Sequence, residues 1–146
     1  MTIVECPEPY LAAGPSLFLA GGITGCVDWQ RELCALLADG PYDLLNPRRR
    51  DFPIDDPRAA PEQIEWEHAH LRRADAIVFW FAAETLQPIA LYELGAWSMT
   101  DKPLFVGADP AYARRLDVEI QTRLARPDVR VVADLASLAR QVLASR

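Results

Sequence analysis

The chain has 146 residues, of which 51% are hydrophobic and 25% charged, a balance typical of a globular domain rather than of a disordered segment. Its net charge of -6 argues against a nucleic-acid polymer as partner, because such binding needs a basic surface that displaces counterions from phosphates. Three cysteines and two histidines form no disulfide or zinc pattern, and the longest apolar run, residues 76–83, is too short to span a bilayer. We expect a soluble, cytoplasmic protein without a metal or cofactor, folded as a single domain over residues 1–146.

Short runs rich in apolar, β-branched and aromatic residues predict five strands buried on both faces. In chain order they cover residues 16–21, 42–45, 76–81, 104–107 and 129–132. Residues 1–14 are an N-terminal extension or an edge strand, since only residues 2–6 resemble a strand.

Between these runs, apolar residues recur at helical spacing and predict five helices. Their marker residues are Trp29, Leu33, Leu36 and Leu37; Ile64, His68 and Leu71 after Pro61; Leu91, Leu94 and Met99 after Pro88; Leu116, Ile120 and Leu124; and Leu135, Leu138 and Val142. Strands that alternate with helices indicate an α/β fold, because parallel neighbours are joined by crossover connections. We expect a flavodoxin-like (Rossmann-like) three-layer sandwich with a roughly five-stranded parallel sheet.

Ligands of such sheets bind beyond the carboxyl ends of the strands, where the strand order reverses. The segments that follow the first three predicted strands, residues 20–25, 46–51 and 83–88, are rich in functional groups. They contain neither the GxGxxG spacing of dinucleotide sites nor a phosphate loop, so NAD and ATP are not indicated. Gly21 and Gly22 would let a ligand approach the backbone, although a tight turn explains them equally simply.

Glu93 is the strongest catalytic candidate. Pro88 suits the first position of a helix, which places Glu93 about one and a half turns in, near the positive end of the helix dipole. We expect this carboxylate to stay ionised and to be able to attack an anomeric carbon, while a second carboxyl protonates the leaving group. The second acid stays open among Glu67, Glu84, Asp51 and Asp55.

An ordered set of motifs resembles the nucleoside 2-deoxyribosyltransferase family, most closely its short bacterial branch. The motifs are Phe18-Leu19-Ala20-Gly21-Gly22, Asp28-Trp29, Asn46-Pro47-Arg48-Arg49, Gln63-Ile64-Glu65-Trp66-Glu67, the strand over residues 74–81, Glu84-Thr85, Pro88-Ile89 and Tyr92-Glu93-Leu94-Gly95. The resemblance extends from about residue 16 to residue 132. It implies a flavodoxin-like fold and exchange of one nucleobase for another on 2-deoxyribose, with retention of configuration and without a cofactor.

The resemblance also implies roles for particular residues. Glu93 is the nucleophile, and Glu67 helps to hold the sugar and the nucleophile. The acid that handles the proton of the base corresponds to Glu84, or to Gln87 by strict spacing. Phe18 would stack on the sugar, and Asp117 would enter the pocket of a neighbouring subunit, so a homo-oligomer (dimer or higher) is expected. The remaining substrate-binding candidates are Gly21, Gly22, Trp29, Asn46, Arg48, Arg49 and Trp66.

Arg48, Arg49 and Arg50 raise an alternative, because adjacent arginines could hold the phosphate of a nucleoside 5'-monophosphate for hydrolysis by an N-glycosidase. A solvated face paired with nearby acids is the simpler interpretation of such a run. A non-catalytic nucleotide-sensing module is a third possibility, because a fold does not establish catalysis. The expected partners are small deoxynucleosides and free nucleobases, with no membrane.

Overall fold

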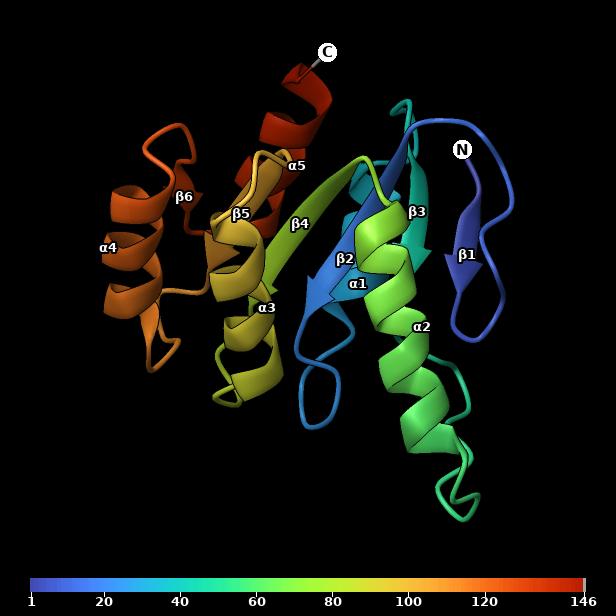
Figure 1. Ribbon diagram of the computed structural model, residues 1–146. Helices are drawn as coiled ribbons and strands as arrows, with labels where there is room; N and C mark the ends of the chain where they lie inside the picture. The colour runs from blue at the N-terminus through green and yellow to red at the C-terminus, as the bar shows by residue number, and fades with distance from the viewer. Residues whose placement is uncertain (146) are drawn as a thin grey trace.

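The computed structural model describes residues 1–145 and contains a six-stranded sheet in which all neighbouring strands are parallel (Figure 1). The strand order is β1-β3-β2-β4-β5-β6. The strands are β1 (Ile3–Glu5), β2 (Ser16–Gly21), β3 (Asp43–Asn46), β4 (Ala76–Phe81), β5 (Leu104–Ala108) and β6 (Val131–Val132). The α/β, flavodoxin-like fold expected from the sequence is therefore confirmed.

All five predicted strands are present, and the sheet has one strand more than expected. Ile3–Glu5 pairs with β3 in parallel, so part of the N-terminal region is an edge strand. β2 and β4 are the central strands, and every residue of β4 is buried. This burial on both faces explains why an uninterrupted apolar run identified β4 so clearly.

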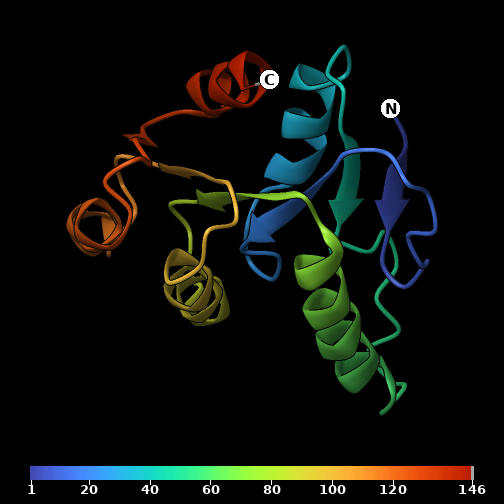
Figure 2. The ribbon, with the colours of Figure 1, turned by 45° about the horizontal axis from the view of Figure 1, so that its top comes forward.

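Five helices cover the two faces of the sheet (Figure 2). They are α1 (Trp29–Leu36), α2 (Ala59–Arg73), α3 (Pro88–Ser98), α4 (Arg115–Ala125) and α5 (Leu135–Ala144). Helices α1 and α5 pack on one face around Leu33 and Leu138, while α2, α3 and α4 pack on the other around Trp66, Leu94 and Val118. Each face thus has its own apolar core. Among residues 1–145, no helix is long and apolar enough to cross a membrane.

The apolar face predicted for α4 is wrong, and that predicted for α2 is only partly right, although both helices exist. Leu71 of α2 is buried as predicted, but Ile64 is 65% exposed and Trp66 contacts the core in its place. Leu116 and Leu124 of α4 are exposed, while Val118 and Thr122 face inward. Periodicity locates a helix, but it identifies the wrong buried face when that face contains a polar residue such as Thr122.

The strand order reverses between β2 and β4. The chain moves outward from β2 to β3 through α1, then crosses back through α2 to β4 on the other side of β2. Crossovers that leave in opposite directions open a crevice at the carboxyl ends of these two strands. The loops after β2 and β4 therefore meet where a ligand is expected.

Candidate active site

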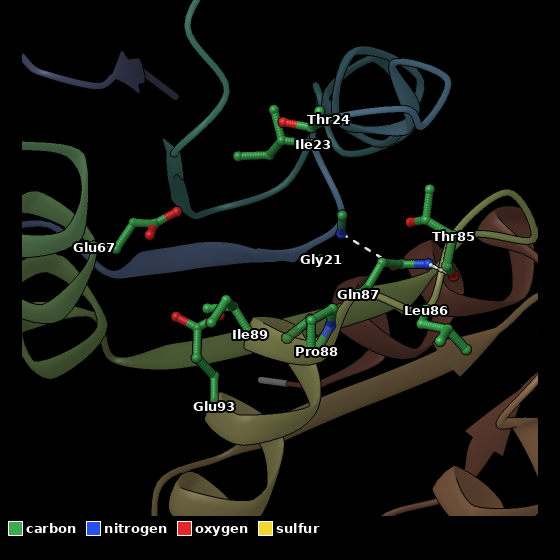
Figure 3. A pocket seen from close by; sticks show the side chains of 12 residues that line it. Gly21, Ile23, Thr24, Glu67, Thr85, Leu86, Gln87, Pro88, Ile89 and Glu93 are labelled. Carbon is green, nitrogen blue, oxygen red and sulfur yellow. Dashed lines mark hydrogen bonds between the residues drawn. The ribbon is translucent and has the colours of Figure 1, made fainter. Parts of the chain in front are cut away.

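A cavity of about 350 Å³ opens between the loops that follow β2 and β4 (Figure 3). The first loop contributes residues 21–24, the second loop and the start of α3 contribute residues 85–90, and α2 and α3 add Glu67 and Glu93. The volume lies within the range of small-molecule sites. The cavity therefore occupies the position that the fold assigns to a ligand.

Glu67 and Glu93 are the charged residues that line this cavity, and they approach it from different helices (Figure 3). Pro88 begins α3, as the sequence predicted, and Glu93 follows in the second turn of that helix. Both carboxyl groups are half-buried. None of the lysines and arginines in residues 1–145 lines the cavity.

The pKa of Glu93 is raised to about 8, first because burial disfavours the charged form and second because Glu67 is a nearby negative charge. The pKa of Glu67 is also raised by burial, an effect that a hydrogen bond from Gln63 partly offsets. The expectation that Glu93 stays ionised is thus wrong, because its carboxyl is largely protonated at neutral pH with this pKa. Glu93 lies beyond the first turn of α3, where the helix dipole has little influence, so burial decides its charge.

Gln63 orients Glu67 from the preceding turn of α2. Its Nε2 donates to the carbonyl of Pro47 at 2.7 Å and, more weakly, to Oε1 of Glu67 at 3.4 Å. The Cys6 thiol donates to Oε1 of Gln63 at 3.1 Å. Because Oε1 is bound to this thiol, it is Nε2 that faces the carboxyl of Glu67. The segment after β1 therefore supports a pocket residue that lies far away in the sequence.

Gly21 and Gly22 line the cavity, but neighbouring side chains also require them to be glycines. A Cβ on Gly21 would lie 2.5 Å from Cζ2 of Trp29, and one on Gly22 would lie 2.5 Å from Sγ of Cys26. Trp29 is 1% exposed, and its Nε1 donates to the carbonyl of Gly22 at 2.9 Å. Trp29 thus supports the loop from behind and does not line the cavity.

The two candidates for the acid of the β4–α3 loop lie in different environments. Glu84 is exposed, and its Oε1 accepts a long hydrogen bond of 3.4 Å from the backbone N–H of Val27. Gln87 is buried at the edge of the cavity, with its amide bound to backbone groups of Gly22, Ala82 and Thr85. The structure therefore brings Glu67 into the cavity beside Glu93, keeps Glu84 outside it, and lets Gln87 line it only with an amide that is already bound to backbone.

Three further candidates lie away from the cavity. Phe18 is 1% exposed within the core below α2. Trp66 stacks on His70 with ring centroids 3.9 Å apart, and its Nε1 donates to the carbonyl of Glu8. Asp117 is on α4, beside a groove between α3 and α4, and pairs with Arg114. Phe18 and Trp66 pack the α2 face, and Asp117 does not line the cavity of its own chain.

The arginine run lines a second, polar groove of about 620 Å³ that borders β1, β3 and α1. The guanidinium of Arg48 donates to the carbonyls of Ile23, Cys26 and Val27, and Asn46 accepts from the backbone N–H of Arg48. Arg49 pairs with Glu62, and Arg50 projects into solvent near Glu5. The guanidinium of Arg48 therefore stabilises the loop beside the cavity, whereas Nη1 of Arg49 is buried without a hydrogen-bond partner.

Several residues that line the cavity were not predicted as substrate-binding residues, although two motifs contain Thr85 and Ile89. They are Ile23, Thr24, Thr85, Leu86, Ile89 and Ala90. All of them lie in or next to the loop segments that the switch-point rule had marked. The rule could therefore locate the segments, but the choice of side chains within them depends on how each loop turns.

The comparisons with known proteins give one match. A family model described as "Nucleoside 2-deoxyribosyltransferase like" matches residues 14–112, a range that contains both carboxylates and both loops of the cavity. A search of curated proteins found no match. Within residues 1–145, no group of three or more histidine, cysteine, aspartate or glutamate side chains is arranged to hold a metal ion.

Proposed function

The chain belongs to the nucleoside 2-deoxyribosyltransferase-like family, and from this premise we propose that it exchanges the nucleobase of 2'-deoxyribonucleosides. The observation that carries the proposal is the pair of half-buried carboxyls, Glu67 and Glu93, in one cavity at the switch point of the sheet. A retaining transfer at an anomeric carbon needs two carboxyls, one as nucleophile and one as acid. The cavity provides this pair.

In the proposed mechanism, a carboxylate oxygen of Glu93 attacks the anomeric carbon while the bond from that carbon to the base nitrogen breaks. Glu67 gives its proton to the departing base, and the deoxyribosyl group is held as an ester of Glu93. A second base then attacks the same carbon from the face that the first base left, and its proton returns to Glu67. Two inversions give net retention.

The raised pKa values of both carboxyls support this division of roles. Two acids in one partly dry cavity resist double ionisation, so near neutral pH the pair tends to share a proton. The reactive state has the proton on Glu67 and the charge on Glu93. Substrate binding favours this arrangement, because a developing positive charge on the sugar beside Glu93 stabilises its carboxylate.

The charges of the cavity favour a nucleoside over a nucleoside 5'-monophosphate. A phosphate dianion would meet two carboxyl groups, and within residues 1–145 no lysine or arginine lines the cavity to offset their charge. Arg48 and Arg49, which motivated the hydrolase alternative, are bound to backbone carbonyls and to Glu62. We therefore retain the deoxynucleoside as the proposed substrate.

We further propose that two or more copies assemble through α3 and α4, which lie side by side (Figure 1). Helix α3 carries a single charged residue, yet Ile89, Tyr92 and Met99 are exposed by 63%, 77% and 81%. A helix that is apolar on all sides is normally buried, so its outer side is suited to another copy of the chain. Ile89 lines the cavity, and a partner there would exclude the water that turns transfer into hydrolysis.

Light scattering of the purified protein tests this assembly. The wild type should have the mass of a dimer or larger, and Tyr92→Lys should shift it toward the monomer. Leu11→Lys is the matched control, because Leu11 is 86% exposed in the loop between β1 and β2. A monomeric wild type would rule out this part of the proposal.

The three cysteines, which are free and buried, suit the reducing cytoplasm, where we propose that the protein acts. To test the activity, the protein is incubated with deoxyinosine or thymidine and a second base, and products are separated by chromatography. We expect a new deoxynucleoside with little free sugar, and no product from Glu93→Ala. Unchanged substrates, or a nucleotide substrate that releases sugar phosphate, would contradict the proposal, and binding without turnover would indicate a sensing module.

A further inference from the structure

Gln87 has an unusual backbone conformation at the junction of the two cavity loops. With φ 53° it is the only non-glycine residue with positive φ in residues 1–145, and it is buried immediately before Pro88. A side chain in this left-handed region is strained and persists only where its surroundings fix it. The contacts of its amide identify what fixes it.

All hydrogen-bonding positions of the Gln87 amide are occupied by backbone groups. Oε1 accepts from the N–H of Gly22 at 3.1 Å and of Ala82 at 3.3 Å. Nε2 donates to the carbonyls of Ala82 at 2.7 Å and Thr85 at 2.9 Å. This side chain joins the loop after β2 to the loop after β4, and a carboxylate there would lack both donors.

The same loop is held from its opposite side. The carbonyl of Gly22 accepts from Trp29 and from Nε2 of Gln30, which is fully buried. Oε1 of Gln30 in turn accepts from Arg48 at 3.0 Å, and Arg48 also binds three carbonyls of residues 23–27. Gly22 thus lies between two connected polar networks, with every named amide paired.

We propose that Gln87 and Arg48 are positioning residues that hold residues 22–27 as a preformed wall of the cavity. The inference rests on the proposed function for its link to catalysis. In the resemblance to the transferase family, the strict spacing gave an acidic role to position 87. Here the amide has no free donor or acceptor for a base, so it acts through the loop alone. A wall that is fixed before substrate binds keeps Glu93 and the sugar aligned.

The experiment compares Gln87→Met, Gln87→Glu and Arg48→Lys with Gln141→Met, whose amide makes a single surface hydrogen bond of 3.3 Å. Hydrogen exchange followed by mass spectrometry reports the peptide over residues 22–28, and base-exchange assays give kcat and KM. We expect exchange in that peptide to quicken about tenfold or more in the three test variants, with β4 and α2 unchanged. Gln141→Met should leave both readouts as in the wild type.

For catalysis, kcat should fall about 10- to 100-fold in Gln87→Met, while the apparent pKa values of the pH–rate profile stay as in the wild type. Gln87→Glu should be no more active than Gln87→Met. Activity of Gln87→Glu at or above the wild type would overturn the proposal, because position 87 would then act as an acid. Unchanged exchange over residues 22–28 would also overturn it. Hydrogen exchange needs no turnover, so it tests whether Gln87 and Arg48 hold residues 22–27 even if the wild type has no transferase activity. If a Gln87 variant does not fold, Arg48→Lys provides the same test.

Discussion

Two polar regions lie beyond the carboxyl ends of neighbouring strands, and they differ in whether their charged side chains have partners of opposite charge or hydrogen-bonding partners. In the cavity beyond β2 and β4, Glu67 and Glu93 share a space without any lining cation among residues 1–145. In the groove beside β3, Arg48 and Arg49 are bound to backbone carbonyls and to Glu62. Buried charges that lack partners have shifted pKa values and are suited to chemistry, whereas partnered charges stabilise structure. From the sequence, the arginines had raised a phosphate-binding alternative, although a solvated face was the simpler interpretation of the run.

The largest expected effect distinguishes the nucleophile of the cavity from every residue of the groove. Glu93→Gln keeps the shape of the side chain but removes the carboxylate, so base exchange should fall by about 10⁴-fold or more. Initial rates with a saturating deoxynucleoside and acceptor base provide the measurement. Arg50→Met is the control from the groove, and a Glu93→Gln enzyme with a tenth of the wild-type rate would mean that another residue is the nucleophile.

Glu67→Gln should reduce kcat about 10²- to 10⁴-fold, because the leaving base loses its proton donor. The substitution also removes the negative charge that raises the pKa of Glu93. The acid limb of the remaining activity, where Glu93 must lose its proton, should therefore move to lower pH. A pH profile of kcat/KM checks both statements, and an acid limb that moves upward would contradict the proposed coupling.

In the groove, the expected effect is on stability. Arg48→Met removes a guanidinium that binds three carbonyls and Gln30, and should lower the free energy of unfolding by about 2–3 kcal/mol. Arg50→Met should change it by less than about 0.5 kcal/mol, since Arg50 is in solvent. Urea unfolding gives both values. If the two variants were equally stable, Arg48 would not be a structural residue.

The smallest expected effect is a pH-dependent stabilisation by Glu93→Gln. In the wild type the folded state binds the proton of Glu93 with a pKa of about 8, above the ordinary glutamate pKa of 4.5 that applies to the unfolded chain. Stability due to this group is therefore present at low pH and is lost as the pH rises from 4.5 to 8. Glu93→Gln should unfold like the wild type near pH 4.5 and become progressively more stable than the wild type as the pH rises to 8.

Thermal unfolding of both proteins across this pH range provides the measurement. If the difference in melting temperature between Glu93→Gln and the wild type became smaller as the pH rises, the pKa of Glu93 would not be raised. A stabilised but inactive variant would instead match the conflict between stability and activity that is common at catalytic sites.

The sequence predicts the architecture and the nucleophile's position because both depend on local signals. β4 is recognisable as an apolar run buried on both faces, and Pro88 marks the helix start that places Glu93 at the switch point. The charge of Glu93 could not be predicted, because it depends on burial and on Glu67 from another helix. The role of Gln87 depends on Gly22, which lies 65 residues away, so no local pattern reveals it.

The aromatic candidates show a related limit. The family resemblance implied that Phe18 stacks on the sugar, and Trp29 was expected to lie near the ligand. In the structure both are 1% exposed, since the core beneath that loop needs their volume. An aromatic residue near a site is as well suited to packing as to stacking on a base, and only tertiary structure distinguishes the two. Sequence position alone therefore overestimated the number of ligand contacts.

Capture of the covalent intermediate is the most direct test of whether Glu93 is the nucleophile. The wild type is mixed with a deoxynucleoside in the absence of an acceptor base, quenched in acid, digested and analysed by mass spectrometry. We expect the mass of the peptide that contains Glu93 to increase by one deoxyribosyl group, and we expect no such increase in Glu93→Gln. Base exchange without any adduct on Glu93, or an adduct on Glu67 instead, would contradict it.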